Sequence, residues 1–416
     1  MTRITDDGPR RTSVYRLSVV AALAALVAFS GPAASAPVKR SATVTITINT
    51  LPIANGLPLD LGIKKGFFSA QGIEITKRTL QSGNDIVLAL QNSTGEIGYV
   101  GWVPAMIART QGIPLTAVAA SDVEGTSEAD NWQNILVKGS SAIRTPADLA
   151  GKTIAVNALK GVGEVMIKAA LKKRNVDPNS IRLLAMPFPT MRTALANGQV
   201  DAIWTPEPFM SQVLSDGGRI VMAPGPVLGQ FWPIGVYVAR TEWAQSNPAL
   251  AQKFRTAMHQ SLAYAQAHGD EIRELLPAAT RNVRLPIWTP LIDRDQLVEL
   301  AKYSKEYGVI STLPNMTLLV PSTVAGGKTL QGAVGERYIL LRQDGKAVTS
   351  LKAGRYTFVV VDNSKTQNFR LVGPGVNKAT SRPGTGRTTW TLTLRKGTYT
   401  FSSSARPSLK KTFKVT

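Results

Sequence analysis

Two stretches of the chain repeat one pattern. The first runs from Leu88–Asn92 to Ile97–Pro104, and the second from Thr193–Asn197 to Val200–Pro206. Each predicts a helix ending at a polar turn, a short buried strand, a Trp at the strand's carboxyl end, and a helix opening on Pro. Proline is tolerated there because its missing N–H has no partner in a first helical turn. Two α/β lobes on one plan predict a ligand between them, since crevices of such sheets lie beyond the carboxyl ends of the strands.

The chain opens with a predicted signal peptide over residues 1–36. Arg10 and Arg11 precede an apolar run, Val19–Phe29, that is too short for a permanent membrane span. The small residues Ala34-Ser35-Ala36 follow, but Pro37 disfavours cleavage at that point, so the cut can fall a few residues away. An uncleaved anchor is the alternative. We expect export to the periplasm or the extracytoplasmic cell envelope.

The chain holds no cysteine and only two histidines. Disulfides, a thiolate nucleophile, Cys-ligated metals and a lipid-carrying Cys are therefore excluded. His259 and His268 fall on one predicted helix, which leaves little for histidine catalysis or metal binding. We predict no metal, no cofactor and no enzymatic activity.

The charge distribution predicts a domain boundary. Residues 321–416 hold 17 Lys and Arg against three Asp and Glu, whereas residues 37–320 hold 27 against 22. The run Pro321–Lys328 has the composition of a linker. We expect a linker over 321–330 and a basic domain over 331–416. Such a surface is either simply solvated or binds an anionic cell-wall polymer or lipid headgroups; we expect no nucleic-acid partner.

Between these ends, predicted strands and helices alternate, which favours mostly parallel sheets. Examples are the strand Val44–Asn49, a helix from Pro248 to His268 and a helix Asp293–Tyr307. We predict one lobe from residues 43–135 and 236–320, and a second lobe from 136–235. The two connections, near Trp132–Lys138 and Ile234–Arg240, would form a hinge. We expect a monomer.

Four segments carry a family resemblance: "LGIKKGFFSAQGIEI" from Leu61, "IGYVGWVPAMIA", "TPADLAGKTIAVN" and "ALANGQVDAIWTPEPF". They resemble, in the same order, substrate-binding proteins of ABC importers of the sulfonate/nitrate/taurine type, a group that includes binders of thiamine-pyrimidine precursors. The resemblance covers residues 43–320. It implies an α/β, two-lobed type II periplasmic-binding-protein fold that closes on a small molecule and delivers it to an ABC permease in the cytoplasmic membrane.

Two features suggest different ligands. Gly83 and Gly161 lie at strand-to-helix turns, where backbone can approach a ligand and unpaired N–H groups favour an anion. Four tryptophans suit a flat ring, and Glu207 suits a donor-rich one. A sulfonate- or nitrate-like anion and a nitrogen heterocycle therefore remain two equally favoured ligand classes. The predicted ligand-binding residues are Leu51, Pro52, Gln81, Ser82, Gly83, Asn84, Gly101, Trp102, Trp132, Asn157, Lys160, Gly161, Gly163, Trp204, Glu207 and Trp232.

The basic tail predicts a small all-β sandwich, with short strands separated by Gly- and Pro-containing turns. Its stretch from Gln367 to Phe413 resembles cupredoxin-like domains. That resemblance places the copper ligands at Gln367, Ser403, Arg406 and, with a one-residue gap, Leu409. Blue copper needs two His and a Cys thiolate, so we expect the fold without the metal.

We predict an extracytoplasmic solute-binding protein of an ABC importer. The alternative is an envelope-attached ligand sensor or interaction protein in which the basic sandwich does the main work. A third hypothesis is an enzyme, because relatives of this fold include a pyrimidine synthase. The Cys-rich motif on which that chemistry depends is absent from this sequence.

Overall fold

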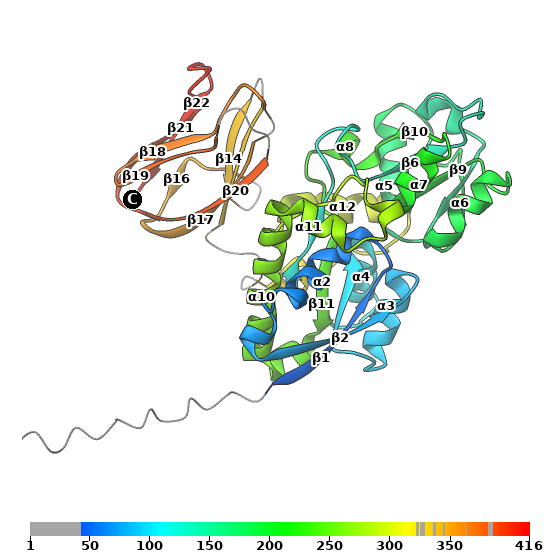
Figure 1. Cartoon of the computed structure of the whole chain (residues 1–416), viewed down its shortest axis with the longest axis horizontal. Helices are drawn as coiled ribbons and strands as arrows, with labels where there is room; N and C mark the ends of the chain where they lie inside the picture. The colour runs from blue at the N-terminus through cyan, green and yellow to red at the C-terminus, as the bar shows by residue number, and fades with distance from the viewer. Residues whose placement is uncertain are drawn as a thin grey trace, which may run out of the picture. The chain divides into compact units, whose positions relative to one another are not determined.

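The computed structural model describes residues 43–321, 324, 329–335, 338–343, 346–362, 364–381 and 386–416 (Figure 1). The predicted signal peptide and most of the predicted linker lie outside the described residues.

The first sheet has the strand order β2-β1-β3-β11-β4. Its central strands carry fully buried apolar side chains, such as Ile48 of β1 and Val100 of β3. Strand β1 pairs in parallel with both β2 and β3, whereas the returning strand β11 runs antiparallel to β3 and to β4. The bounds are β1 Val44–Thr50, β2 Ile73–Thr79, β3 Ile97–Gly101, β4 Leu115–Ala120 and β11 Gly235–Arg240.

The second sheet repeats this arrangement in the order β8-β7-β9-β6-β10. Here β7 is parallel to β8 and β9, while β6 runs antiparallel to β9 and β10. Both sheets are therefore mixed rather than mostly parallel. In each sheet, the strand that follows a crossing from the other sheet runs antiparallel to its neighbours: β11 in the first sheet and β6 in the second. The repeated pattern places β3 and β9 at the same central position. The bounds are β6 Gln133–Val137, β7 Thr153–Val156, β8 Arg182–Ala185, β9 Ala202–Pro206 and β10 Arg219–Met222.

Helices cover both faces of each sheet, as apolar strands with two buried faces require. On the first sheet, α2 and α10 (Pro248–Ala267) pack on one face around Phe68 and Phe254, and α3 and α4 pack on the other around Leu90 and Met106 (Figure 1). The core around Leu90 and Met106 continues from α4 into α5 and the second sheet. The bounds are η1 Ala54–Gly56, α2 Leu57–Lys64, η2 Ser69–Gln71, α3 Gly83–Gln91, α4 Trp102–Thr110, η3 Pro146–Leu149, α5 Val162–Lys173, α6 Phe188–Ala196, α7 Phe209–Ser215 and α8 Pro224–Leu228.

The chain crosses between the two sheets twice, through residues 121–132 and 223–234. We call these stretches the crossover segments. They directly precede β6 and β11, which occupy the ranges predicted as connections. The hydrogen bond from Glu124 N to Trp232 O, 2.8 Å, joins the two segments. Within the first of them, β5 (Asp122–Val123) pairs with β12 (Ile287–Trp288) as a two-stranded sheet.

The helices predicted after β11 are confirmed. The long run from Pro248 forms α10, whose Pro stands in the first turn, and Asp293 caps α12 by accepting the N–H groups of Asp295 and Gln296. The bounds of this part are α9 Thr241–Ser246, α10 Pro248–Ala267, α11 Gly269–Glu274, η4 Ala278–Thr280, α12 Arg294–Glu306 and α13 Met316–Leu319.

One expected boundary is wrong. The second copy of the pattern predicts a helix opening at Pro206, but Pro206 is the last residue of β9 and α7 begins at Phe209. The backbone stays extended because β9 continues to pair with β6 as far as Pro206 opposite Gln133.

The C-terminal β-rich region consists of two five-stranded sheets, coloured orange to red in Figure 1. The two sheets share a single apolar core, to which Phe358, Phe369, Tyr399 and Phe413 contribute aromatic rings. The strand orders are β15-β14-β13-β17-β20 and β16-β22-β21-β18-β19. The bounds are β13 Thr329–Val334, β14 Ile339–Gln343, β15 Lys346–Ala347, β16 Ser350–Leu351, β17 Gly354–Asp362, β18 Arg370–Gly373, β19 Val376–Ala379, β20 Gly386–Leu394, β21 Gly397–Ser402 and β22 Lys410–Val415.

No helix in the described part of the chain has the length and apolar character needed to cross a membrane.

Candidate functional site

A narrow cavity of about 50 Å³ lies where the two sheets face each other, and we call it the cleft. It is lined by residues from the ends of β1 and β3, from β9 and from the turns that lead into three helices. The lining residues are Leu51, Ile53, Asn55, Gly83, Tyr99, Gly101, Pro104, Gln133, Asn157, Ala158, Gly161, Val162, Phe188, Trp204 and Ile234.

The cleft receives the N-termini of α3, α4 and α5. Gly101 and Gly161 precede α4 and α5 and have no side chain with which to cap them. Ser82 caps α3 through its Oγ, which accepts the N–H of Asp85 at 3.2 Å. First-turn N–H groups have no acceptor inside their own helix, so these termini together favour a negative charge.

Close packing around the cleft requires glycine at two places, one between the two sides of the cleft and one within the second side. A Cβ on Gly101 would stand 2.5 Å from Cγ2 of Val162 in α5, so the turn after β3 of the first sheet directly approaches the helix that follows β7 of the second sheet. A Cβ on Gly163 would stand 2.6 Å from the ring of Trp204. The cleft is narrow at Gly101 because backbone, rather than a side chain, faces Val162 there, and Gly163 lets the Trp204 ring pack against α5.

Two buried polar atoms at the cleft have no partner. The indole Nε1 of Trp204 and the amide Oδ1 of Asn55 make no hydrogen bond, although both residues lie inside the protein. An unpaired buried polar group costs about 1–3 kcal/mol. A ligand that accepts from the indole and donates to the amide would remove both costs. Phe188 adds an apolar wall beside Trp204, with ring centroids 6.3 Å apart.

Six predicted ligand-binding residues line the cleft: Leu51, Gly83, Gly101, Asn157, Gly161 and Trp204. Six others lie in the same turns but do not line it: Pro52, Gln81, Ser82, Asn84, Lys160 and Gly163. Among these, Lys160 is exposed and has a positive φ of 54°. Its N–H donates to Glu164 Oε2 at 2.7 Å, which ties the turn to the start of α5.

The other four predicted residues, Trp102, Trp132, Glu207 and Trp232, do not line the cleft. Trp132 is fully buried and donates from Nε1 to Val123 O at 3.0 Å, and Trp232 packs in the core with its ring 6.3 Å from that of Tyr303. Trp102 is the first residue of α4 and faces a different cavity.

Glu207 follows the last strand residue of β9 and contacts segments that belong to the first-sheet part of the chain. Its carboxylate accepts Ser211 Oγ at 2.7 Å, Ser211 N at 3.0 Å and Arg284 N at 3.0 Å. Its backbone oxygen accepts Ala54 N at 3.0 Å. Burial raises the pKa of this carboxyl, and the hydrogen bonds from Ser211 and Arg284 oppose the shift. These contacts occupy the carboxylate with protein donors.

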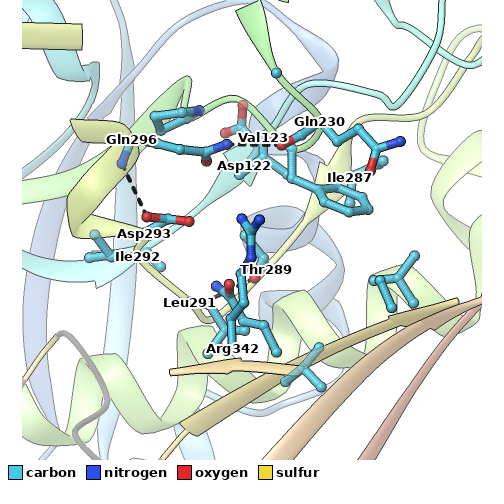
Figure 2. A pocket seen from close by; sticks show the side chains of 18 of the residues that line it. Asp122, Val123, Gln230, Ile287, Thr289, Leu291, Ile292, Asp293, Gln296 and Arg342 are labelled. Atoms are coloured by element: carbon cyan, nitrogen blue, oxygen red, sulfur yellow. Dashed lines mark hydrogen bonds between the residues drawn. The ribbon is translucent and has the colours of Figure 1, made fainter. Parts of the chain in front are cut away.

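A second, larger cavity of about 310 Å³ lies beside the crossover segments (Figure 2). Asp122, Gln230 and Gln296 face it, together with Arg342 of β14 (Figure 2). The nearby start of α12 is closed to an anion because the Asp293 side chain already accepts its first N–H groups. The smaller cleft is therefore the better candidate site.

Sequence reasoning missed several lining residues, above all Asn55, Tyr99 and Gln133. Asn55 lies in η1, the short helix that follows β1, and a polar residue just beyond the carboxyl end of a central strand was the available signal. Tyr99 and Gln133 lie inside apolar strands and gave no such signal. Among the described residues, no group of His, Cys, Asp or Glu could hold a metal ion.

The chain is similar in sequence to known binding proteins. The model of the family described as NMT1/THI5 like matches residues 54–272. The taurine-binding periplasmic protein of Escherichia coli (strain K12) is 27% identical over 190 residues, covering 45% of this chain and 56% of that protein. The match thus spans little more than half the length of that relative.

Among solved structures, the alkanesulfonate-binding protein SsuA from Xanthomonas axonopodis pv. citri, bound to MOPS, has a TM-score of 0.55 and 22% identity, covering 67% of this chain and 99% of that chain. The periplasmic nitrate-binding protein NrtA from Synechocystis PCC 6803 has a TM-score of 0.56 and 14% identity, covering 68% and 88%. These likenesses identify the periplasmic binding protein fold. Since the family model covers more than half of the residues, the chain belongs to the NMT1/THI5-like family.

Proposed function

We propose that this protein is the solute-binding component of an ABC importer and that its cleft holds a small, singly charged organic anion of the sulfonate class. The observation that carries the proposal is the convergence of three helix N-termini on one narrow cleft, two of them without a side-chain cap. Relatives named for taurine and alkanesulfonate support the same class of ligand.

The charge of the lining favours one negative charge. None of the described residues that line the cleft carries a charged side chain. Helix termini supply only partial positive charge, which suits a monoanion better than a dianion such as a phosphate monoester. The nitrogen heterocycle is less favoured, because the Glu207 carboxylate that would accept its donors is already occupied by Ser211 and Arg284.

The domain division supports closure around the ligand. We propose two lobes with the expected boundaries moved to where the strands begin, residues 43–132 with 235–320 and residues 133–234, because β6 to β10 all lie in the second sheet and β11 returns to the first. The contact of Gly101 with Val162 joins the lobes at the cleft. Hinge bending would then open this contact, admit the ligand and present the closed form to a permease in the cytoplasmic membrane.

A thermal-shift screen tests the ligand class. Ethanesulfonate, 2-hydroxyethanesulfonate, taurine, nitrate, inorganic phosphate and an aminopyrimidine are added in turn to the purified protein. A ligand present at about a hundred times its Kd stabilises the native state by about 2.7 kcal/mol. We expect this shift from a sulfonate. A shift from the aminopyrimidine alone would contradict the proposal.

The C-terminal region gives a second, more limited proposal. We propose a cupredoxin-like sandwich that binds no copper. Two of the four positions that the resemblance assigns to the metal, Gln367 and Ser403, lie together, and Ser403 Oγ donates to Gln367 Oε1 at 2.8 Å. Both side chains are buried, and their hydrogen bond fills the space with polar contacts that need no metal. Stoichiometric Cu(II) binding with an intense visible band would contradict this.

The same region supports retention of an exported protein at the envelope. Strand register places Arg370, Lys410 and Lys414 on the outward face of one sheet, opposite the buried Leu371 and Phe413. The one acidic side chain in the described part of residues 329–416, Asp362, is buried.

We propose that this face binds an anionic wall polymer. Binding to isolated envelopes should weaken from about 0.1 M to about 1 M salt, as the Debye length falls from about 10 Å to about 3 Å. Exchange of Lys410 and Lys414 for Glu should weaken it further at low salt. Equal retention in all these conditions would exclude the polymer and leave a merely solvated surface.

A further inference from the structure

Asp122 of β5 lies behind the cleft and holds two of its polar side chains. Asn55 Nδ2 donates to Asp122 Oδ2 at 2.6 Å, and Tyr99 OH donates to Asp122 Oδ1 at 2.9 Å. All three residues are buried, and the two donors line the cleft. Figure 2 shows Asp122 from the side of the larger cavity. Asp122 therefore links the first crossover segment to the cleft.

An ionised carboxylate only accepts hydrogen bonds, so it determines which end of the Asn55 amide it contacts. The NH₂ group must face Asp122, and the carbonyl Oδ1 is the end that remains. This oxygen is buried and has no partner. The backbone of Asn55 is also held, because Trp288 Nε1 donates to Asn55 O at 3.2 Å. Neither the side chain nor the backbone can easily turn the amide around.

The second lobe repeats this arrangement. Gln133, which also lines the cleft, donates from Nε2 to Glu124 Oε1 at 2.7 Å. Glu124 follows Asp122 in the same crossover segment and is fully buried. Thus each lobe contributes an amide whose NH₂ group is bound to a carboxyl group of the crossover segment. At this end of the cleft, Asn55 Oδ1 is a buried acceptor without a partner, and the helix N-termini supply N–H donors.

We propose that Asp122 is a specificity-determining positioning residue, which fixes Asn55 as a hydrogen-bond acceptor, so that the ligand is an organic anion that also carries an O–H or N–H donor. This inference rests on the proposed anion site and adds the second half of the recognition. The anionic group lies at the helix N-termini, and the donor lies toward Asn55. A plain alkanesulfonate or nitrate offers no donor and leaves Asn55 Oδ1 unpaired.

The test compares ligands that differ only at the donor. Dissociation constants for ethanesulfonate, 2-hydroxyethanesulfonate and taurine are measured by calorimetry with the full chain. The wild type should bind one of the two donor-bearing sulfonates at least about tenfold more tightly than ethanesulfonate, as expected when a buried acceptor is satisfied rather than left unpaired. In Asp122→Asn, an amide faces an amide and either orientation of Asn55 is allowed, so the preference should fall to about threefold or less.

Two further variants keep the test decisive. Asp293→Asn makes the same chemical change at a carboxylate that caps α12 and does not touch Asn55, so the preference should stay at its wild-type value. Asn55→Ala removes the acceptor itself and should erase the preference even if Asp122→Asn fails to fold. Melting curves establish which variants are folded.

The outcomes separate the two proposals. Equal affinity of the wild type for all three sulfonates would overturn the role of Asp122 and leave the anion site intact. A preference that survives in both folded Asp122→Asn and Asn55→Ala would also overturn it. No binding of any of the three to the wild type would overturn the sulfonate proposal and this inference with it.

Discussion

The two copies of the repeated pattern occupy the same place in their sheets, yet their tryptophans differ. In the first copy, β3 ends at Gly101, and Trp102 is already the first residue of α4, facing the larger cavity. In the second copy, β9 continues past Trp204 to Pro206, and Trp204 lines the cleft. A strand and a helix point consecutive side chains in different directions. The place at which a strand ends therefore decides whether a similarly placed Trp packs away from the cleft or lines it.

The largest expected effect is a loss of protein stability when the Trp of the first copy is replaced. Trp102→Ala should lower the free energy of unfolding by about 3–5 kcal/mol, the range for loss of a large buried aromatic ring. Trp102 is buried and belongs to the continuous core that extends from the first sheet to the second. Denaturant titration measures the loss. Calorimetry on the folded variant should give a ligand affinity close to that of the wild type. A large loss of affinity in this variant would mean that Trp102 contributes to binding as Trp204 is expected to do.

The crossover segment that separates the copies should make stability depend on pH. Burial raises the pKa of Glu124 from 4.5 to about 8. The folded protein then holds a proton that the unfolded chain has lost, so this contribution to stability is fully present below pH 4.5 and is lost as pH rises through about 8. The free energy of unfolding of the wild type should therefore fall between about pH 5 and 8. We expect Glu124→Gln to reduce this fall by roughly 2–4 kcal/mol.

Denaturant titrations of both proteins across this range measure the difference. The difference between the two proteins removes contributions from other groups, such as His259, whose pKa burial lowers from 6.5 to about 4 and which acts in the opposite direction below pH 6.5. Identical pH profiles for the two proteins would show that Glu124 titrates as it does in the unfolded chain.

In the second copy, the expected loss is one of binding. Trp204→Ala should weaken binding of the best sulfonate by about 1–3 kcal/mol, or about 5- to 150-fold, as when an aromatic anchor in a pocket is removed. Calorimetry measures the change. Because Trp204 is also buried, some loss of stability is expected, so Trp132→Ala serves as a control for a buried Trp outside the cleft. Equal affinities for Trp204→Ala and wild type would move the site elsewhere.

The smallest effect concerns the approach of the lobes. Gly101→Ala places a methyl group against Val162 and should oppose closure, raising Kd by about tenfold, near the lower end of the cost of overpacking. Gly56→Ala is the matched control, because a Cβ there meets nothing within 4 Å. An unchanged Kd for Gly101→Ala would mean that ligand-bound lobes stand farther apart than in this structure.

Much of the fold followed from local patterns in the sequence. The strand positions of β3 and β9, the long helix α10 and the capped helix α12 depend on hydrophobic periodicity, Pro in a first turn and Asp at an N-cap, all of which are short-range. Gly83 and Gly161 were likewise predictable as cleft residues, since glycine before a helix permits close approach of backbone.

Side-chain roles depended on partners far away in sequence. Glu207 was a candidate ligand contact by sequence, but Arg284, 77 residues later, supplies one of the N–H groups that occupies it. Asn55 was not a candidate, yet Asp122, 67 residues later, fixes its amide. Hydrogen-bond donors and acceptors acquire their direction only when the chain brings them together. The sequence determined where strands, helices and glycine turns lie; the tertiary structure alone decided which buried polar groups remain free for a ligand, because that depends on which distant groups have already satisfied the others.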